Sequence, residues 1–193
     1  MENACTALAA LHYVNRNGIG VSLDAVRQAF ANARWPGRFE RLETGNRIVV
    51  FDGAHTPAAA EALAATWVAH FGNRRASTIV GMGSDKHPAP FLEALQPIVS
   101  ELIATRARSP RAMDPARIAA EANALGITTR GSPSVADAID SLTSDSSPMV
   151  LITGSLFVAG EGREAYGLAA GDEVWEELNA LRVTTIPPSS RGN

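Results

Sequence analysis

Four short polar segments each follow an apolar run, and they contain the residues best suited to chemistry. They are residues 52–55, 83–87, 106–111 and 154–155. Their arginine and lysine side chains suit the binding of phosphate or carboxylate groups. A glycine turn before a helix adds backbone N–H groups and the positive end of the helix dipole, which attract the same anions. The four segments therefore predict a site for an anionic ligand.

Individual residues in these segments have a functional interpretation and a structural one. Asp52 can accept hydrogen bonds from ribose hydroxyls or simply cap its own turn. Lys86, the single lysine among 17 basic residues, can hold an anionic group or lie in solvent on its loop. His55 can face a ligand or pack against its loop at the start of a helix. Polar residues at strand ends are over-represented in binding sites, which favours the functional interpretation of Asp52 and Lys86.

The same residues also suggest a metal site, and this alternative predicts a metal-dependent hydrolase. Asp52, His55, Asp85 and His87 supply two carboxylates and two imidazoles, which are common ligands of a divalent ion. Two other motifs do not occur in the sequence: the Gly-x-x-x-x-Gly-Lys-Ser/Thr phosphate-binding loop and the Gly-x-Ser-x-Gly motif of serine hydrolases. We therefore expect any triphosphate to be held mainly by another domain.

Strands and helices that alternate along residues 37–170 must position the four segments. Apolar runs predict strands at residues 47–51, 77–82, 101–105, 127–130 and 149–153. The pairs Thr56-Pro57 and Asp114-Pro115 predict the starts of intervening helices. This alternation is typical of an α/β fold, here a Rossmann-like, open and mostly parallel sheet of about five or six strands with helices on both faces. Because the carboxyl ends of parallel strands share one edge, the polar segments should meet there.

The first 36 residues have a different pattern, which predicts a short helical segment. Apolar residues recur at three- and four-residue spacing from Ala4 to Val14, and Ser22 suits the N-cap of a second helix. We interpret residues 1–36 as the end of a preceding domain and residues 37–170 as the Rossmann-like domain. Residues 171–193 are then a C-terminal extension, whose polar and proline-containing end we expect to be disordered.

The composition excludes several classes of protein. A formal net charge of −3 and an isoelectric point near 5.8 do not provide the basic surface of a nucleic-acid-binding protein. No apolar run approaches the ~20 residues that span a bilayer, and no secretory signal pattern opens the sequence. Cys5 is the single cysteine, so no internal disulfide forms and a reducing compartment is indicated. We expect a cytoplasmic protein with neither a nucleic-acid nor a membrane partner.

Four motifs stand in order along residues 35–156. They are Trp35-Pro36-Gly37-Arg38-Phe39-Glu40, Phe51-Asp52-Gly53-Ala54-His55-Thr56-Pro57, Gly81-Met82 with Asp85-Lys86, and Gly154-Ser155-Leu156. Together they resemble the C-terminal part of the folylpolyglutamate synthase/dihydrofolate synthase family, within the Mur ligase superfamily. The resemblance covers about residues 2–168. It implies a central P-loop ATPase domain before the Rossmann-like domain, with residues 1–36 as the closing helices of that ATPase domain.

The resemblance also implies a reaction and gives roles to particular residues. The family forms an amide bond at the expense of ATP: the carboxylate of a folate (dihydropteroate or tetrahydrofolate) is phosphorylated, and the amino group of L-glutamate attacks the acyl phosphate. ATP and Mg²⁺ are expected to bind mainly to the central domain, so this chain should be inactive alone. The positions that match are Arg38, Asp52 and His55 for the nucleotide, Ser155, Lys86 and Asp85 for glutamate, and His55 and Lys86 for catalysis.

Two further interpretations stand beside this one. The folate branch usually has asparagine after the histidine, whereas Thr56 is similar to the residue of peptidoglycan-building Mur ligases. The chain can therefore be the C-terminal domain of such a ligase, and Thr56 can cap the next helix in either case. It can also be a free-standing nucleotide- or anion-binding module that catalyses no reaction.

Overall fold

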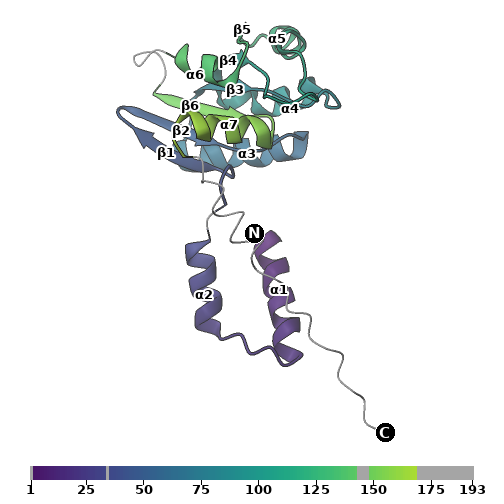
Figure 1. Cartoon of the computed structure of the whole chain (residues 1–193), viewed down its shortest axis with the longest axis vertical. Coiled ribbons are helices and arrows are strands. Elements are labelled where there is room, and N and C mark those ends of the chain that lie inside the picture. The colour runs from purple at the N-terminus through teal and green to yellow at the C-terminus, as the bar shows by residue number, and fades with distance from the viewer. Residues whose placement is uncertain (1, 34, 143–147, 169–193) are drawn as a thin grey trace. The chain divides into compact units, whose positions relative to one another are not determined.

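The chain forms two compact units, Met1–Pro36 and Gly37–Asn193. The computed structural model describes residues 2–33, 35–142 and 148–168 (Figure 1). The extension expected at residues 171–193 lies outside the described residues. None of the helices in these three ranges is long and apolar enough to cross a membrane.

The first unit consists of helices α1 (Glu2–Arg16) and α2 (Leu23–Asn32), as the apolar spacing predicts. The hydroxyl of Ser22 accepts a hydrogen bond of 3.1 Å from the amide of Ala25, which confirms Ser22 as the N-cap of α2. No residue of α2 is buried. The interpretation of this unit as the end of an ATPase domain stays a prediction.

A six-stranded sheet forms the centre of the second unit, and its strand order is β1-β2-β6-β3-β4-β5. All neighbouring strands are parallel except the first pair, which is antiparallel. This arrangement confirms the expected open, mostly parallel sheet. The strands are β1 (Glu40–Thr44), β2 (Arg47–Phe51), β3 (Ala76–Val80), β4 (Val99–Ala104), β5 (Thr129–Gly131) and β6 (Met149–Thr153).

Helices cover both faces of the sheet (Figure 1). Alternate residues of a strand point to opposite faces, so Met149 and Leu151 join one apolar cluster while Val150 and Ile152 join the other. The first cluster includes residues of α3, α4 and α5, and the second includes residues of α6 and α7. The helices are α3 (Pro57–Phe71), α4 (Pro88–Leu95), α5 (Pro115–Ala124), α6 (Val135–Asp140) and α7 (Leu156–Ala165), with a 3₁₀ turn at Gln96–Ile98.

Several details differ from the sequence prediction. Strand β1 was not predicted, because its sequence Glu-Arg-Leu-Glu-Thr is mostly polar and offers Leu42 as its single apolar residue. Among the described strands it lies at the edge of the sheet and pairs only with β2, through a tight turn at Gly45 with φ of 56°. The strand predicted at residues 77–82 is shifted to Ala76–Val80, and the one predicted at 127–130 is shifted to Thr129–Gly131.

Candidate functional site

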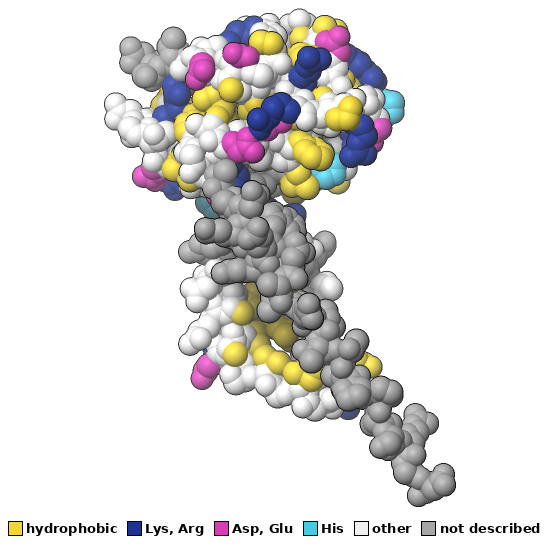
Figure 2. Space-filling model, viewed as in Figure 1, with side chains coloured by type: hydrophobic (Ala, Val, Ile, Leu, Met, Phe, Trp, Pro, Cys, Tyr) yellow, Lys and Arg dark blue, Asp and Glu magenta, His cyan; other side chains and the backbone are white. Residues whose placement is uncertain are grey.

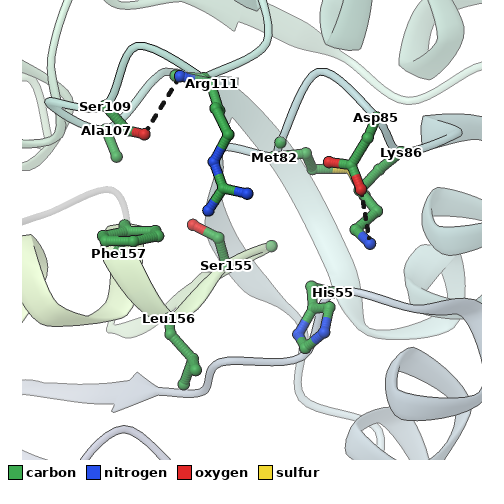
Figure 3. Close-up of a pocket in the computed structure, with 13 residues that line it drawn as sticks. His55, Met82, Asp85, Lys86, Ala107, Ser109, Arg111, Ser155, Leu156 and Phe157 are labelled. Carbon is green, nitrogen blue, oxygen red and sulfur yellow. Dashed lines mark hydrogen bonds and ion pairs between the residues drawn. The ribbon is translucent and has the colours of Figure 1, made fainter.

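A pocket of about 220 Å³ opens at the carboxyl edge of the sheet (Figure 3). Its walls come from the turns that follow β2, β3, β4 and β6, as the rule for parallel sheets predicts. All four polar segments of the sequence therefore contribute to one cavity. The polar side chains that line it are His55, Asp85, Lys86, Ser109, Arg111 and Ser155.

Backbone hydrogen bonds join the walls of this pocket. The amide of Gly154 donates to the carbonyl of Ala54 at 3.0 Å, and the amide of Ser84 donates to the carbonyl of Arg111 at 2.8 Å. Gly154 has φ of +99°, and a Cβ there would lie 2.6 Å from the carbonyl oxygen of Gly81. Both the backbone conformation and the space therefore require glycine at this position.

Ser155 lies at the start of α7 and half-buried in the pocket wall. Its hydroxyl accepts a hydrogen bond of 3.0 Å from the amide of Val158 and so caps the helix. Leu156 and Phe157, the first residues of α7, also line the pocket. Because the first N–H groups of a helix have no partner within it, this end of α7 favours an anion.

Arg111 enters the pocket from the opposite wall and points toward Ser155 (Figure 3). Its guanidinium makes no hydrogen bond or ion pair with any residue that the structure describes, although its backbone amide donates to Ser109. An exposed guanidinium beside the N-terminus of a helix is well suited to bind a carboxylate or a phosphate group.

Lys86 and Asp85 form an ion pair of 3.0 Å at another side of the pocket. The hydrogen bond from Lys86 is the main reason that the pKa of Asp85 lies below its ordinary value. Asp85 is therefore ionised at neutral pH, and it neutralises part of the charge of Lys86. The pair can offer both an acceptor and a donor to a zwitterionic ligand.

The imidazole of His55 lies on the side of the pocket formed by the turn after β2 (Figure 3). Its Nδ1 is 2.9 Å from the carbonyl oxygen of Gly53. Because a carbonyl oxygen only accepts, Nδ1 carries the proton in this contact, and the neutral ring keeps its lone pair on Nε2. The ring is exposed, so Nε2 is accessible to a ligand.

Asp52 lies outside the pocket lining and holds the backbone around it. Its two carboxylate oxygens accept hydrogen bonds of 2.8 Å from the amides of Phe39 and Ala54. Burial raises the pKa of Asp52, while these two hydrogen bonds and the charge of Arg38 oppose that rise. The turn-capping interpretation of Asp52 is therefore present in the structure, and its expected contact with ribose stays a prediction.

Arg38 also lies outside the pocket lining, on an exposed turn. Its guanidinium makes no hydrogen bond or ion pair within the described ranges of the chain. The two neighbours of Arg38 have left-handed backbone conformations, with φ of 70° at Gly37 and 44° at Phe39. A non-glycine residue in this region is held there by its surroundings, which is common at functional sites.

The metal-site alternative is not supported by the arrangement of the side chains. Among the described residues, no three His, Cys, Asp or Glu side chains are grouped so that they could hold a metal ion. Asp52, His55, Asp85 and His87 are described and form no such group. The prediction of a hydrolase metal centre from these four residues is therefore wrong, because Asp52 faces backbone amides instead.

The sequence named Arg111 in a polar segment but gave it no specific role. The signal was its place after a strand end, which it shares with Arg106 and Arg108. The fold distinguishes their roles. Arg111 lines this pocket, whereas Arg108 forms ion pairs with Glu161 and Glu164.

Residues 37–156 match the sequence profile of the family described as Mur ligase, glutamate ligase domain. The chain is 37% identical over 167 residues to a probable bifunctional folylpolyglutamate synthase/dihydropteroate synthase of Halobacterium salinarum, a match that covers 84% of this chain and 19% of the relative. It is 34% identical over 190 residues to a dihydrofolate synthase/folylpolyglutamate synthase of Mycobacterium tuberculosis, covering 86% of this chain and 38% of the relative.

The fold also matches a solved structure of a bifunctional folylpolyglutamate synthase/dihydrofolate synthase with Mn, AMPPNP and L-glutamate bound. The TM-score is 0.72 at 29% sequence identity, and the match covers 86% of this chain and 39% of that one. The chain thus spans between a fifth and two fifths of the length of these relatives.

Proposed function

This chain belongs to the Mur ligase family through its glutamate ligase domain, and from that premise we propose that it is the C-terminal domain of an ATP-dependent folate–glutamate ligase. The ligase joins L-glutamate to the carboxylate of dihydropteroate or tetrahydrofolate. The observation that carries the proposal is the pocket that gathers His55, Asp85, Lys86, Arg111 and Ser155 at the carboxyl edge of the sheet. These groups suit an amino acid with two carboxylates.

The pocket provides a partner for each charged group of glutamate. One carboxylate binds between the guanidinium of Arg111 and the start of α7, where the hydroxyl of Ser155 adds a further contact. The Asp85–Lys86 pair lies at the other side and binds the remaining polar groups of the amino acid. This division orients the amino group before it reacts, which is a large part of catalysis in a two-substrate reaction.

His55 is the residue that takes a proton during amide formation. The nucleophile is the neutral amine of glutamate, so its ammonium must lose a proton before it attacks the acyl phosphate. Nε2 of His55 accepts that proton, because the contact of Nδ1 with Gly53 keeps the lone pair on Nε2. The amine adds to the acyl carbon, and the tetrahedral intermediate then collapses: the bond between the acyl carbon and the phosphate oxygen breaks, and inorganic phosphate leaves with the second proton of the nitrogen. Lys86 stabilises the negative charge that develops.

Arg38 and Asp52 belong to the nucleotide side of the reaction. The exposed guanidinium of Arg38 has no protein partner among the described residues and is free to bind ATP phosphates. Asp52 supports the turn on which Arg38 stands, and its oxygens keep lone pairs for the ribose hydroxyls.

The described residues of this chain form no group of three potential metal ligands. We assign the binding of ATP and Mg²⁺ mainly to a central P-loop domain, as the family resemblance implies. The solved relative with Mn, AMPPNP and L-glutamate supports the use of a nucleotide, a divalent ion and glutamate in this family. The folate-type names of the two curated relatives favour a folate acceptor over a peptidoglycan precursor.

The experiment that tests this function uses a ligase that carries this chain as its C-terminal domain. It is incubated with ATP, radiolabelled L-glutamate and either dihydropteroate, tetrahydrofolate or a peptidoglycan precursor. We expect labelled product and ADP release with a folate acceptor, and no product from the chain alone. Product with the peptidoglycan precursor instead, or efficient ligation by the chain alone, would contradict the proposal.

A further inference from the structure

Helix α7 contacts the two loops that carry the proposed substrate-binding arginines. The Arg38 loop, defined here as Gly37–Glu40, ends at the first residue of β1. The Arg111 loop, defined here as residues 105–113, follows β4. We propose that Arg163 and Glu161 of α7 are positioning residues for the reaction: Arg163 holds the Arg38 loop for the nucleotide, and Glu161 holds the Arg111 loop for glutamate. The kinetic part of this inference rests on the proposed function.

Arg163 reaches the Arg38 loop through Glu40. One carboxylate oxygen of Glu40 accepts hydrogen bonds of 2.7 Å from both the backbone amide of Gly37 and Nε of Arg163. The side chains of Arg163 and Glu40 are only 15% and 25% exposed, so this ion pair is weakly screened by solvent. It closes the loop across its two ends, with Arg38 between them.

Other contacts fix the same loop and leave the side chain of Arg38 unattached. The amide of Gly53 donates to the carbonyl of Gly37 at 2.7 Å, and the amide of Phe39 donates to Asp52 at 2.8 Å. The backbone on each side of Arg38 is therefore bonded, in the left-handed conformations that place its guanidinium. A loop that holds one exposed, unpaired arginine this firmly is organised for that side chain to bind something.

Glu161 holds the second loop in a corresponding way. Its carboxylate accepts a hydrogen bond of 2.6 Å from the backbone amide of Arg108 and lies 3.6 Å from Nε of the same residue. The side chain of Glu161 is 15% exposed, like that of Arg163. Arg108 also pairs with Glu164. The loop continues directly to Ser109 and Arg111, which line the pocket.

Glu161 and Arg163 lie two residues apart on one helix, and the N-cap of that helix, Ser155, lines the pocket. A single rigid element thus sets three parts of the site relative to one another. Small displacements of a binding group reduce rates steeply, by as much as about 100-fold for 1 Å, so such an element has a functional consequence as well as a structural one.

The test compares Arg163→Met with Glu161→Met in a ligase that carries this chain. We expect Arg163→Met to raise KM for ATP about tenfold with KM for L-glutamate changed less than about twofold, and Glu161→Met to do the reverse. Arg163→Lys and Glu161→Gln, which keep a donor or an acceptor, should recover part of each loss. Arg117→Met, at an exposed position on α5, is the control and should change neither constant.

Amide hydrogen exchange on the chain itself separates this inference from the proposed function. Arg163→Met should accelerate exchange at Gly37, and Glu161→Met should accelerate exchange at Arg108, each without affecting the other amide. The positioning roles would be overturned if the exchange rates of both amides changed equally, or if neither changed. They would also be overturned if both Michaelis constants rose in proportion to a loss of stability. If the amides respond as expected but Arg38→Ala leaves KM for ATP unchanged, the loop contacts stand and the nucleotide assignment of Arg38 fails.

Discussion

Gly154 should be the glycine whose replacement disturbs this site most. Its φ of +99° is unfavourable for any residue with a side chain, and an added Cβ would lie 2.6 Å from the backbone oxygen of Gly81 and 3.0 Å from Cγ1 of Val80. The conformation costs about 1–3 kcal/mol, and overfilling a packed site costs about 1–3 kcal/mol more. Gly154→Ala should therefore lower the free energy of unfolding by about 2–6 kcal/mol, out of the ~5–15 kcal/mol of a typical domain.

Urea unfolding of the chain, followed by circular dichroism, measures this effect. With an m-value of about 2 kcal/mol/M, even the lower limit moves the midpoint by about 1 M. The matched control is Gly160→Ala within α7, where an added Cβ meets no atom within 4 Å. There alanine should keep or raise the midpoint, since it favours a helix over glycine by about 1 kcal/mol. Equal midpoints for the two variants would refute the reasoning about Gly154.

Two carboxyl groups give predictions about pH. In Lys86→Met, loss of the hydrogen bond should bring the pKa of Asp85 back toward its ordinary value, which a carbon-detected NMR titration reports; an unchanged pKa would show that Lys86 is not its main cause. Because burial raises the pKa of Asp52, the folded protein binds that proton more tightly than the unfolded chain, and ionisation of Asp52 lowers stability as pH rises. Asp52→Asn removes this ionisation, so the stability of the variant relative to wild type should increase from about pH 4 to about pH 7 in urea unfolding. A relative decrease over that range would contradict the burial argument.

The sequence predicted the parts of the fold that depend on strong local signals. The helix starts after Ser22, Thr56 and Asp114 follow from capping residues that act within four positions. The buried strands follow from apolar runs such as that of β6. Strand β1 was not predicted from the sequence, because its residues are mostly polar and it is stabilised by pairing with β2. Its place at the edge, with exposed residues, explains its polarity.

The site was predicted at the level of segments rather than of side chains. Parallel-sheet geometry was enough to bring His55, Lys86 and Ser155 into one pocket. It could not separate Arg111 from Arg108, because both follow the same strand and the carboxylates that pair with Arg108, Glu161 and Glu164, lie more than 50 positions later in the sequence. It also could not show that Asp52 accepts a hydrogen bond from the amide of Phe39, since that contact depends on a loop 13 residues earlier.

The face of the second unit shown in Figure 2 has basic and acidic side chains interspersed rather than a continuous basic surface. This distribution agrees with the low net charge of −3. In the proposed function, specific binding of anionic groups depends on the few cations placed at the carboxyl edge rather than on the net charge of the chain.

In the proposed function, one edge of this domain binds glutamate in the pocket and the nucleotide beside it, through different residues. The most direct measurement is of KM for L-glutamate and for ATP in Ser155→Ala and Arg38→Ala forms of a ligase that carries this chain. Loss of a hydrogen bond to a charged group is worth about 1.5–3 kcal/mol, or roughly 10- to 150-fold in affinity. We predict that Ser155→Ala raises KM for glutamate toward the lower end of this range and Arg38→Ala raises KM for ATP, each leaving the other constant nearly unchanged. Unchanged constants in both variants, or the same substrate affected by both, would contradict the account.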